Sequence, residues 1–176
     1  RPEAAAGPSA VARLRWAFIK PTVGSTVDGE RVSLVDECSF SLFGDCSTSW
    51  DLALPQGTPV RVRTTSGDIS VDGLDGDLEV DTTSGDVIGG VFSAKRVTVT
   101  ATSGDVDLRL STAPESVVVT STSGSIRLVL PNDGTAYAVQ VSTAAGDVTN
   151  ELVNAPGATH RIVVETTSGD IEVVRG

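Results

Sequence analysis

One short motif recurs six times in this sequence from residue 64 onward. In its fullest form it reads Thr-Thr-Ser-Gly-Asp followed by Val or Ile, and successive copies place their glycines 18, 19, 20, 22 and 23 residues apart. Recurrence at such an interval is typical of a repeat protein, in which each copy forms one unit that stacks on its neighbours. The predicted corner residues are the glycines of the six copies: Gly67, Gly85, Gly104, Gly124, Gly146 and Gly169.

Apolar residues recur at fixed places around each of these glycines. The residue five positions before glycine is Val in all copies, and Ile or Val follows two positions after it. Alternation with period two is typical of a strand with one buried face, so each copy predicts a strand, a corner and a second strand. Equivalent strands stacked about 4.8 Å apart would join these side chains into one core. We therefore predict an all-β fold, a parallel β-solenoid with two strands per coil, about six Ser-Gly-Asp corners and an N-terminal β cap.

A β-sandwich is the main alternative to this fold. It would explain the alternation, but the hairpin turns of a sandwich have no reason to repeat one sequence. In a solenoid, by contrast, each corner needs a residue without a side chain, and Ser and Asp on either side of it hydrogen-bond the turn amides.

The acidic residue after each corner glycine forms a column that is interrupted once. Its carboxylates either cap the turn amides or bridge the coils through calcium. Calcium-binding β-rolls carry two glycines at each corner, whereas here there is one, and Ser125 breaks the column. Capping is the favoured interpretation, and apart from calcium at these carboxylates no metal site is predicted. The candidate calcium ligands are Asp68, Asp86, Asp105, Asp147 and Asp170.

The region before the repeats has a different composition. Five of the seven aromatic residues fall within the first 50 positions, and strands are expected at residues 13–20, 31–38 and 49–54. We interpret residues 10–59 as capping strands that close one end of the solenoid, because repeat proteins need capped ends. A separate aromatic binding module is the alternative. Residues 1–9 are predicted to be a disordered leader, and the solenoid at 60–176 is expected to form one continuous domain with the cap.

The two cysteines, Cys38 and Cys46, are spaced to close a short loop within this cap. A disulfide between them would place the protein outside the cytoplasm. Two buried reduced thiols are the alternative, since two cysteines and one distant histidine do not make a four-ligand zinc site.

Several function classes are disfavoured by the composition. The net charge of −10 disfavours nucleic acid and anionic lipid as partners. No apolar run is long enough to cross a bilayer, and the absence of Met predicts that an upstream signal or membrane anchor has been removed. Neither a nucleophile elbow nor a nucleotide-binding glycine motif occurs, so we expect no enzymatic activity and no cofactor. An ice-binding Thr array and a carbohydrate-binding surface are weaker alternatives.

The connections opposite the glycine corners are the favoured binding site. Their predicted lengths increase toward the C-terminus, and variable loops on a rigid scaffold commonly bind partners. We expect an extracytoplasmic, cell-surface or secreted domain that presents this edge to a protein or a cell-envelope component. The alternative is a homo-oligomer that pairs end to end through the coil ending at residues 174–176, which has no evident cap. The candidate partner residues are Asn132, Tyr137, Asn154, His160 and Arg161.

The stretch TTSGDISVDGLDGDLEVDTTSGDV resembles a bacterial family of β-strand repeat domains that are labelled as adhesins and otherwise described as a domain of unknown function. The resemblance covers residues 60–176, and WDLALPQGTPVRV before it is similar to the lead-in strands of actinobacterial members. It implies a β-solenoid, often attached to membrane-anchored or envelope-stress proteins, and brings no catalytic residues. Ser125, Ala144 and Ala145 depart from the corner pattern.

Overall fold

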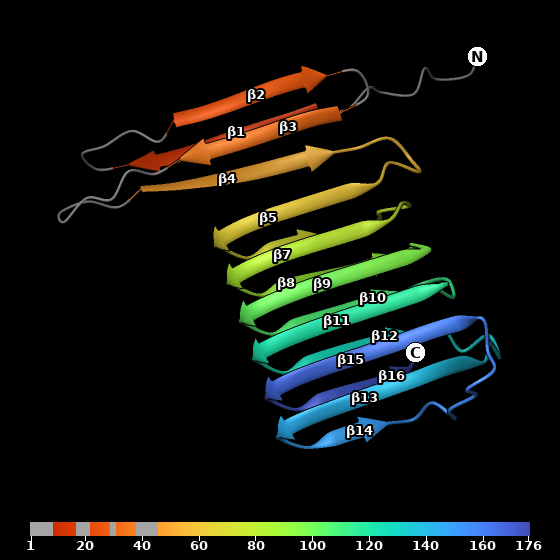
Figure 1. Ribbon diagram of the computed structural model, residues 1–176. Coiled ribbons are helices and arrows are strands. Elements are labelled where there is room, and N and C mark those ends of the chain that lie inside the picture. The colour runs from red at the N-terminus through yellow and green to blue at the C-terminus, as the bar shows by residue number, and fades with distance from the viewer. Residues whose placement is uncertain (1–8, 17–21, 29–30, 38–45) are drawn as a thin grey trace, which may run out of the picture. The chain divides into compact units, whose positions relative to one another are not determined.

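The chain divides into two compact units, Arg1–Pro55 and Gln56–Gly176. The computed structural model describes residues 9–16, 22–28, 31–37 and 46–176 (Figure 1). All regular elements among these residues are strands, as predicted. The division falls after Pro55, and within the second unit the Thr58 carbonyl oxygen lies close to Gly76.

The first unit contains two antiparallel pairs of strands. β1 (Ser9–Trp16) pairs with β4 (Cys46–Ala53), and β2 (Thr22–Asp28) pairs with β3 (Arg31–Glu37). β2 was not predicted, since Gly24 and only two valines give it a weak alternation. Cys38 lies outside the described residues, as does most of the expected leader, so the disulfide stays a prediction. The capping role of this unit also stays a prediction.

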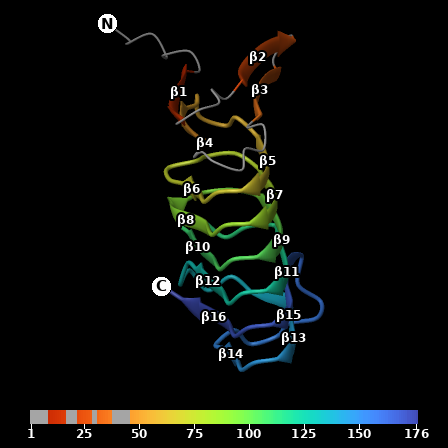
Figure 2. The same cartoon turned by 90° about the vertical axis from the view of Figure 1, so that its left-hand side faces the viewer.

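The second unit is a parallel β-solenoid of six coils, which confirms the predicted fold. Figure 2 shows its two sheets facing each other across the stack. The first sheet has the spatial order β5 (Val60–Ser66), β7 (Leu78–Ser84), β9 (Arg96–Ser103), β11 (Ser116–Ser123), β15 (His160–Ser168) and β13 (Tyr137–Ala145). The second has the order β6 (Ile69–Val71), β8 (Val87–Phe92), β10 (Val106–Leu110), β12 (Ile126–Leu130), β16 (Ile171–Arg175) and β14 (Val148–Asn150).

The predicted valine columns form the core between these sheets. Val80, Val99, Val119 and Val164 face one another in register on successive strands, and each is fully buried. Burying one such side chain stabilises the fold by about 1.5–3 kcal/mol. The column therefore accounts for the stacking of otherwise separate coils.

Each corner brings the backbones of adjacent coils into close contact. Gly104 has a φ of +117°, and a Cβ at this position would lie 2.2 Å from the carbonyl oxygen of Gly85 in the preceding coil. The Thr three positions before glycine faces inward, where the Thr82 hydroxyl donates to the Ser84 carbonyl at 3.3 Å. This bond satisfies a hydroxyl group that would otherwise be buried without a partner. The recurrent Thr and Gly of the motif thus have distinct physical causes.

The last two coils are stacked in the reverse of their order in the chain. The coil of β15 and β16, here called the inserted coil, lies between β11–β12 and the coil of β13 and β14, here called the outer coil (Figures 1 and 2). The corner contacts show the same order, because a Cβ at Gly169 would meet Gly124 and a Cβ at Gly146 would meet Gly169, each at 2.2 Å. The expectation that consecutive copies always lie directly on one another is therefore wrong for this pair.

The hydrophobic effect gives a physical reason for the reversal. The inserted coil contributes four inward side chains that are at most 1% exposed: Ile162, Val164, Ile171 and Val173. At the register positions of Ile171 and Val173 the outer coil carries the smaller Val148 and the polar Asn150. Placing the more apolar coil between two neighbours buries more apolar surface, and a more polar repeat at the end of a stack is typical of repeat proteins.

This order also corrects the expectation that the coil ending at residues 174–176 is the open end of the stack. Ile171–Val173 of β16 pair with β12 on one side and with β14 on the other. At this end of the stack the edge strands are instead β13 and β14, while β5 and β6 are the edge strands at the other end of the two sheets.

Candidate functional site

The loop edge is the side of the solenoid opposite the glycine corners, formed by residues 72–77, 93–95, 111–115, 131–136 and 151–159. The longest of these connections is the last, as the sequence predicts. Their lengths do not increase steadily, because β8 extends to Phe92 and shortens the connection that follows it.

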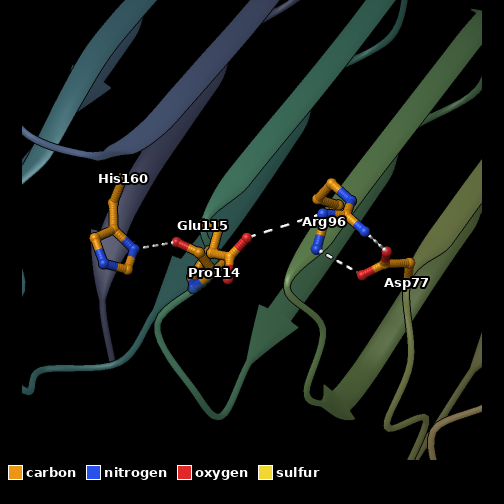
Figure 3. Close-up of polar contacts among 5 residues, drawn as sticks. All are labelled: Asp77, Arg96, Pro114, Glu115 and His160. Carbon is orange, nitrogen blue, oxygen red and sulfur yellow. Dashed lines mark hydrogen bonds and ion pairs between the residues drawn. The ribbon is translucent and has the colours of Figure 1, made fainter.

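A chain of polar contacts crosses several coils along the loop edge (Figure 3). The Arg96 Nη2 donates to Asp77 Oδ2 at 2.6 Å, and the Arg96 backbone N donates to Asp77 Oδ1 at 3.0 Å. Arg96 Nη1 also lies 3.9 Å from Glu115 Oε2 in the next coil. These side chains therefore bridge three consecutive coils. Sequence reasoning missed them, although Asp77 and Arg96 carry opposite charges just before the first inward residue of consecutive coils.

His160 fastens the inserted coil to the same edge. Its Nδ1 lies 2.6 Å from the Pro114 carbonyl oxygen, and since that oxygen only accepts, Nδ1–H is the donor. The Arg161 amide donates to the Glu115 carbonyl at 2.9 Å. The His160 ring packs edge-on against Tyr137, with centroids 5.9 Å apart. His160 thus ties the start of β15 to the connection before β11 and to the start of β13.

Tyr137, the first residue of β13, lies in the hydrophobic core. This position corrects its assignment as a residue presented to a partner. Its ring is 1% exposed, and its hydroxyl has no hydrogen-bond partner among the described residues. Burial raises the pKa of Tyr137, and the nearby negative charge of Asp133 raises this pKa further. The Arg175 guanidinium carbon lies 5.7 Å from the ring centroid, and the guanidinium donates to the carbonyls of Pro131 and Thr135 at 3.0 and 2.9 Å.

The other predicted partner residues, Asn132, Asn154 and Arg161, are exposed. Asn154 also has a structural role, because its Oδ1 accepts from the Val139 amide at 2.9 Å. Beside it, Leu152 is 5% exposed, whereas Val153 is 85% exposed. A buried residue on one side and a hydrogen-bonded residue on the other therefore hold Val153 out into solvent.

The column of corner carboxylates connects neighbouring coils. Asp68, Asp86 and Asp105 each accept a hydrogen bond from the corner amide of the next coil, at 3.0, 2.8 and 2.8 Å. Asp170 accepts likewise from the Asp147 amide at 2.9 Å, and the Ser125 hydroxyl replaces the carboxylate at the interruption. No group of three or more His, Cys, Asp or Glu side chains suited to a metal ion occurs among the described residues. The arrangement is that of the capping interpretation, which needs no ion.

Two open depressions lie on the surface of the solenoid. One, of about 290 Å³, is lined by Arg109, Arg127 and Val129, and the other, of about 370 Å³, by Thr120, Glu165 and Thr167. Neither includes the loop-edge histidine. No helix in the described part of the chain could cross a membrane.

Parallel coils with glycine corners on one side and unequal loops on the other define a β-solenoid repeat domain. The profile of the Toastrack DUF4097 family matches residues 43–174. The chain therefore belongs to this family, a repeat β-domain family of unknown function. Comparisons with curated proteins and with solved structures gave no match. The predicted membership of a repeat-domain family is confirmed, while adhesion and the actinobacterial likeness receive no support from this match.

Proposed function

We propose that this domain is a non-enzymatic structural and interaction module, which acts outside the cytoplasm and presents its loop edge to a protein or a cell-envelope component. The observation that carries the proposal is Val153, which is 85% exposed on the longest connection. An apolar side chain held in solvent by a fixed backbone is ready to be buried by a partner without a large ordering cost. A rigid stack that supports unequal loops favours binding at those loops.

The test compares two substitutions of the same chemistry at different places. Val153→Ser removes the exposed side chain of the loop edge, and Val91→Ser removes one that is 53% exposed on β8. Immobilised protein is incubated with a bacterial envelope extract, and the retained molecules are compared. We expect the Val153→Ser variant to lose a component that the wild-type and Val91→Ser proteins both retain. Equal retention by all three proteins would contradict the proposal, as would no retention by the wild type.

The location outside the cytoplasm is supported by the predicted pairing of Cys38 with Cys46. Protein from the native bacterium, alkylated before reduction, should show both thiols protected. Two alkylated thiols would contradict an oxidising location.

A second candidate function is end-to-end self-assembly. It would use the edge of β13 and β14 in place of the coil ending at residues 174–176, which the sequence indicates. β13 and β14 each have one partner strand, β15 and β16, and on its other side β13 makes only the bridge of Tyr137 to Asn154. Asp68, Asp86, Asp105 and Asp170 each accept a hydrogen bond from a corner amide of the neighbouring coil, whereas no amide among the described residues donates to the Asp147 carboxylate. An incoming strand would complete this pattern. Sedimentation that shows only monomers at high concentration would eliminate this candidate.

A further inference from the structure

We propose that the inserted coil is exchangeable between two copies of this chain. Residues 160–176 of one copy would occupy the place between β11–β12 and β13–β14 of a second copy, which gives a domain-swapped dimer. This inference goes beyond the partner-binding role of the loop edge and does not depend on it.

The place that the inserted coil occupies is formed on both sides by repeat contacts. β15 pairs in register with β11 and with β13, and β16 pairs with β12 and with β14. Its four inward side chains, Ile162, Val164, Ile171 and Val173, enter the same columns that run through the whole stack. Any second copy of the chain carries a segment that makes identical contacts.

The part of the outer coil that can give access to this place is β14, which is weakly held, whereas β13 pairs with β15 along most of its length. β14 pairs with β16 over only three residues, and all of these are exposed. On its far side β14 has no partner strand among the described residues, and β13 has only the bridge of Tyr137 to Asn154. Segments with few buried apolar contacts open at low free-energy cost, so β14 can open first while the rest of the stack stays folded.

The chain order makes the inserted coil enter last. The outer coil precedes it in sequence, and both coils carry the pattern that fits against β11. Val139 and Val141 of the outer coil occupy the same register positions as Ile162 and Val164 of the inserted coil. The place beside β11 must therefore be kept open or reopened for residues 160–176, and a neighbouring copy competes for it.

A short exposed turn is the hinge. The Ala158 amide donates to the Ala155 carbonyl at 2.8 Å, and this turn sends the chain back so that His160 lies beside Tyr137. Pro156 and Gly157 are exposed, and nothing lies within 4 Å of a Cβ built at Gly157. Straightening this turn would carry residues 160–176 to a second copy while all other contacts are kept, which is the low-cost route to a dimer by domain swapping.

A disulfide between two differently substituted chains tests the exchange. Thr120 on β11 lies opposite Glu165 on β15 in the parallel register. Full-length Thr120→Cys and Glu165→Cys proteins, with the native cysteines kept, are mixed, unfolded, refolded together and oxidised. We expect a covalent heterodimer whose fraction rises about tenfold for a tenfold increase in concentration in the dilute range, by mass action.

The matched control pairs Thr120→Cys with Thr100→Cys, because Thr100 on β9 also lies opposite Thr120 but belongs to a coil that does not exchange. A chain that carries both Thr120→Cys and Glu165→Cys should form the bond within itself, which shows that the variants fold and that the two positions reach each other. The proposal is overturned if this internal bond forms while the mixture gives no more heterodimer than the control at any concentration. End-to-end assembly alone would give oligomers without the heterodimer bond, and this outcome also overturns the exchange.

Shortening the hinge gives a second readout. Deleting residues 156–158 leaves too little chain to turn back beside β13, and a shortened hinge favours exchange over the closed monomer. The deleted variant should sediment as a dimer at concentrations where the wild type is a monomer. A folded variant that stays monomeric would contradict the exchange.

Discussion

At the scale of single residues, the absence of a Cβ at the corners allows the coils to approach. The repeated glycine was predicted to be structural from the sequence, and the carbonyl 2.2 Å from the Cβ position at Gly104 gives the reason. A second residue-scale feature, the buried ring of Tyr137, was misjudged. Its place next to Pro and Asn suggests an exposed connection, although Tyr137 precedes Val139 by two residues and the period-two alternation puts it on the inward face. The contact of this ring with Arg175, far away in sequence, has no signal in the local pattern.

Replacing Gly104 with Ala should destabilise the solenoid strongly. The new Cβ would collide with a backbone atom, and the φ of +117° disfavours any side chain, so a loss of about 3 kcal/mol is expected. Gly67→Ala keeps the positive φ but meets nothing within 4 Å, and should cost less. Gly157→Ala has open space and no such φ, and should change the free energy of unfolding by less than about 0.5 kcal/mol. Urea unfolding followed by circular dichroism measures all three, and equal losses would contradict the role of the backbone collision.

The single tyrosine of the chain permits a direct pH test. Because burial raises the pKa of Tyr137, its phenolate should appear only above the usual pH of about 10 in the folded protein. The folded state then holds a proton that the unfolded state has lost. The free energy of unfolding therefore keeps its full value below the pKa that Tyr137 has in the unfolded protein. It falls as the pH rises from there toward the pKa that Tyr137 has in the folded protein. Ultraviolet difference absorption, with urea-unfolded protein as control, measures both values, and a common midpoint would disprove the burial of the hydroxyl.

At the scale of elements, the pairing of neighbouring coils depends on repeated side-chain contacts as well as on backbone ladders. The corner carboxylates cap the amides of the next coil, and ion pairs such as Arg63 to Asp81 and Arg127 to Glu172, at 3.0 and 2.6 Å, join exposed strands. Exposed ion pairs of this kind contribute little each. The sequence predicted the capping role, since the residue types and their place after glycine define it. It did not predict the ladder of Asp77 and Arg96, because a charge read alone in a connection is typical of a solvated surface.

Substitution of Asp86 separates capping from calcium binding. Asp86→Ala removes the acceptor for the Asp105 amide and should cost about 1 kcal/mol. Asp86→Asn keeps an acceptor oxygen and should retain most of the stability, although it removes the charge that calcium would need. A chelator should leave the melting temperature of the wild type unchanged. A chelator-induced decrease, together with an Asn variant as unstable as the Ala variant, would favour the calcium β-roll.

At the scale of the whole molecule, the order of the coils is the feature that sequence reasoning did not find. Alternation shows which side chains face inward, and the corners show how many coils there are, but every coil fits every other. Which coil lies beside which is decided by the total apolar surface buried, and this depends on comparing Ile162 and Ile171 with the valines of the outer coil. The relation of the first unit to the solenoid stays a prediction.

Hydrogen exchange should follow the spatial order and not the order of the chain. Amides of β13 and β14, at the unpaired edge, are expected to exchange faster than those of β15 and β16, which are enclosed on both sides. Peptides that cover residues 137–150 and 160–175, measured by mass spectrometry, report the two coils separately. Slower exchange in 137–150 would contradict the reversed stacking.

The reversed stacking also restricts how such a rod could be made longer. A duplicated repeat placed after residue 176 would start from a coil that is already enclosed, and could reach the free edge of β13 and β14 only by crossing the outer coil. A duplication placed between Leu130 and Tyr137 would extend the series before the reversal and leave the final two coils as they are. Growth by gene duplication should therefore be tolerated better before residue 137 than after residue 176.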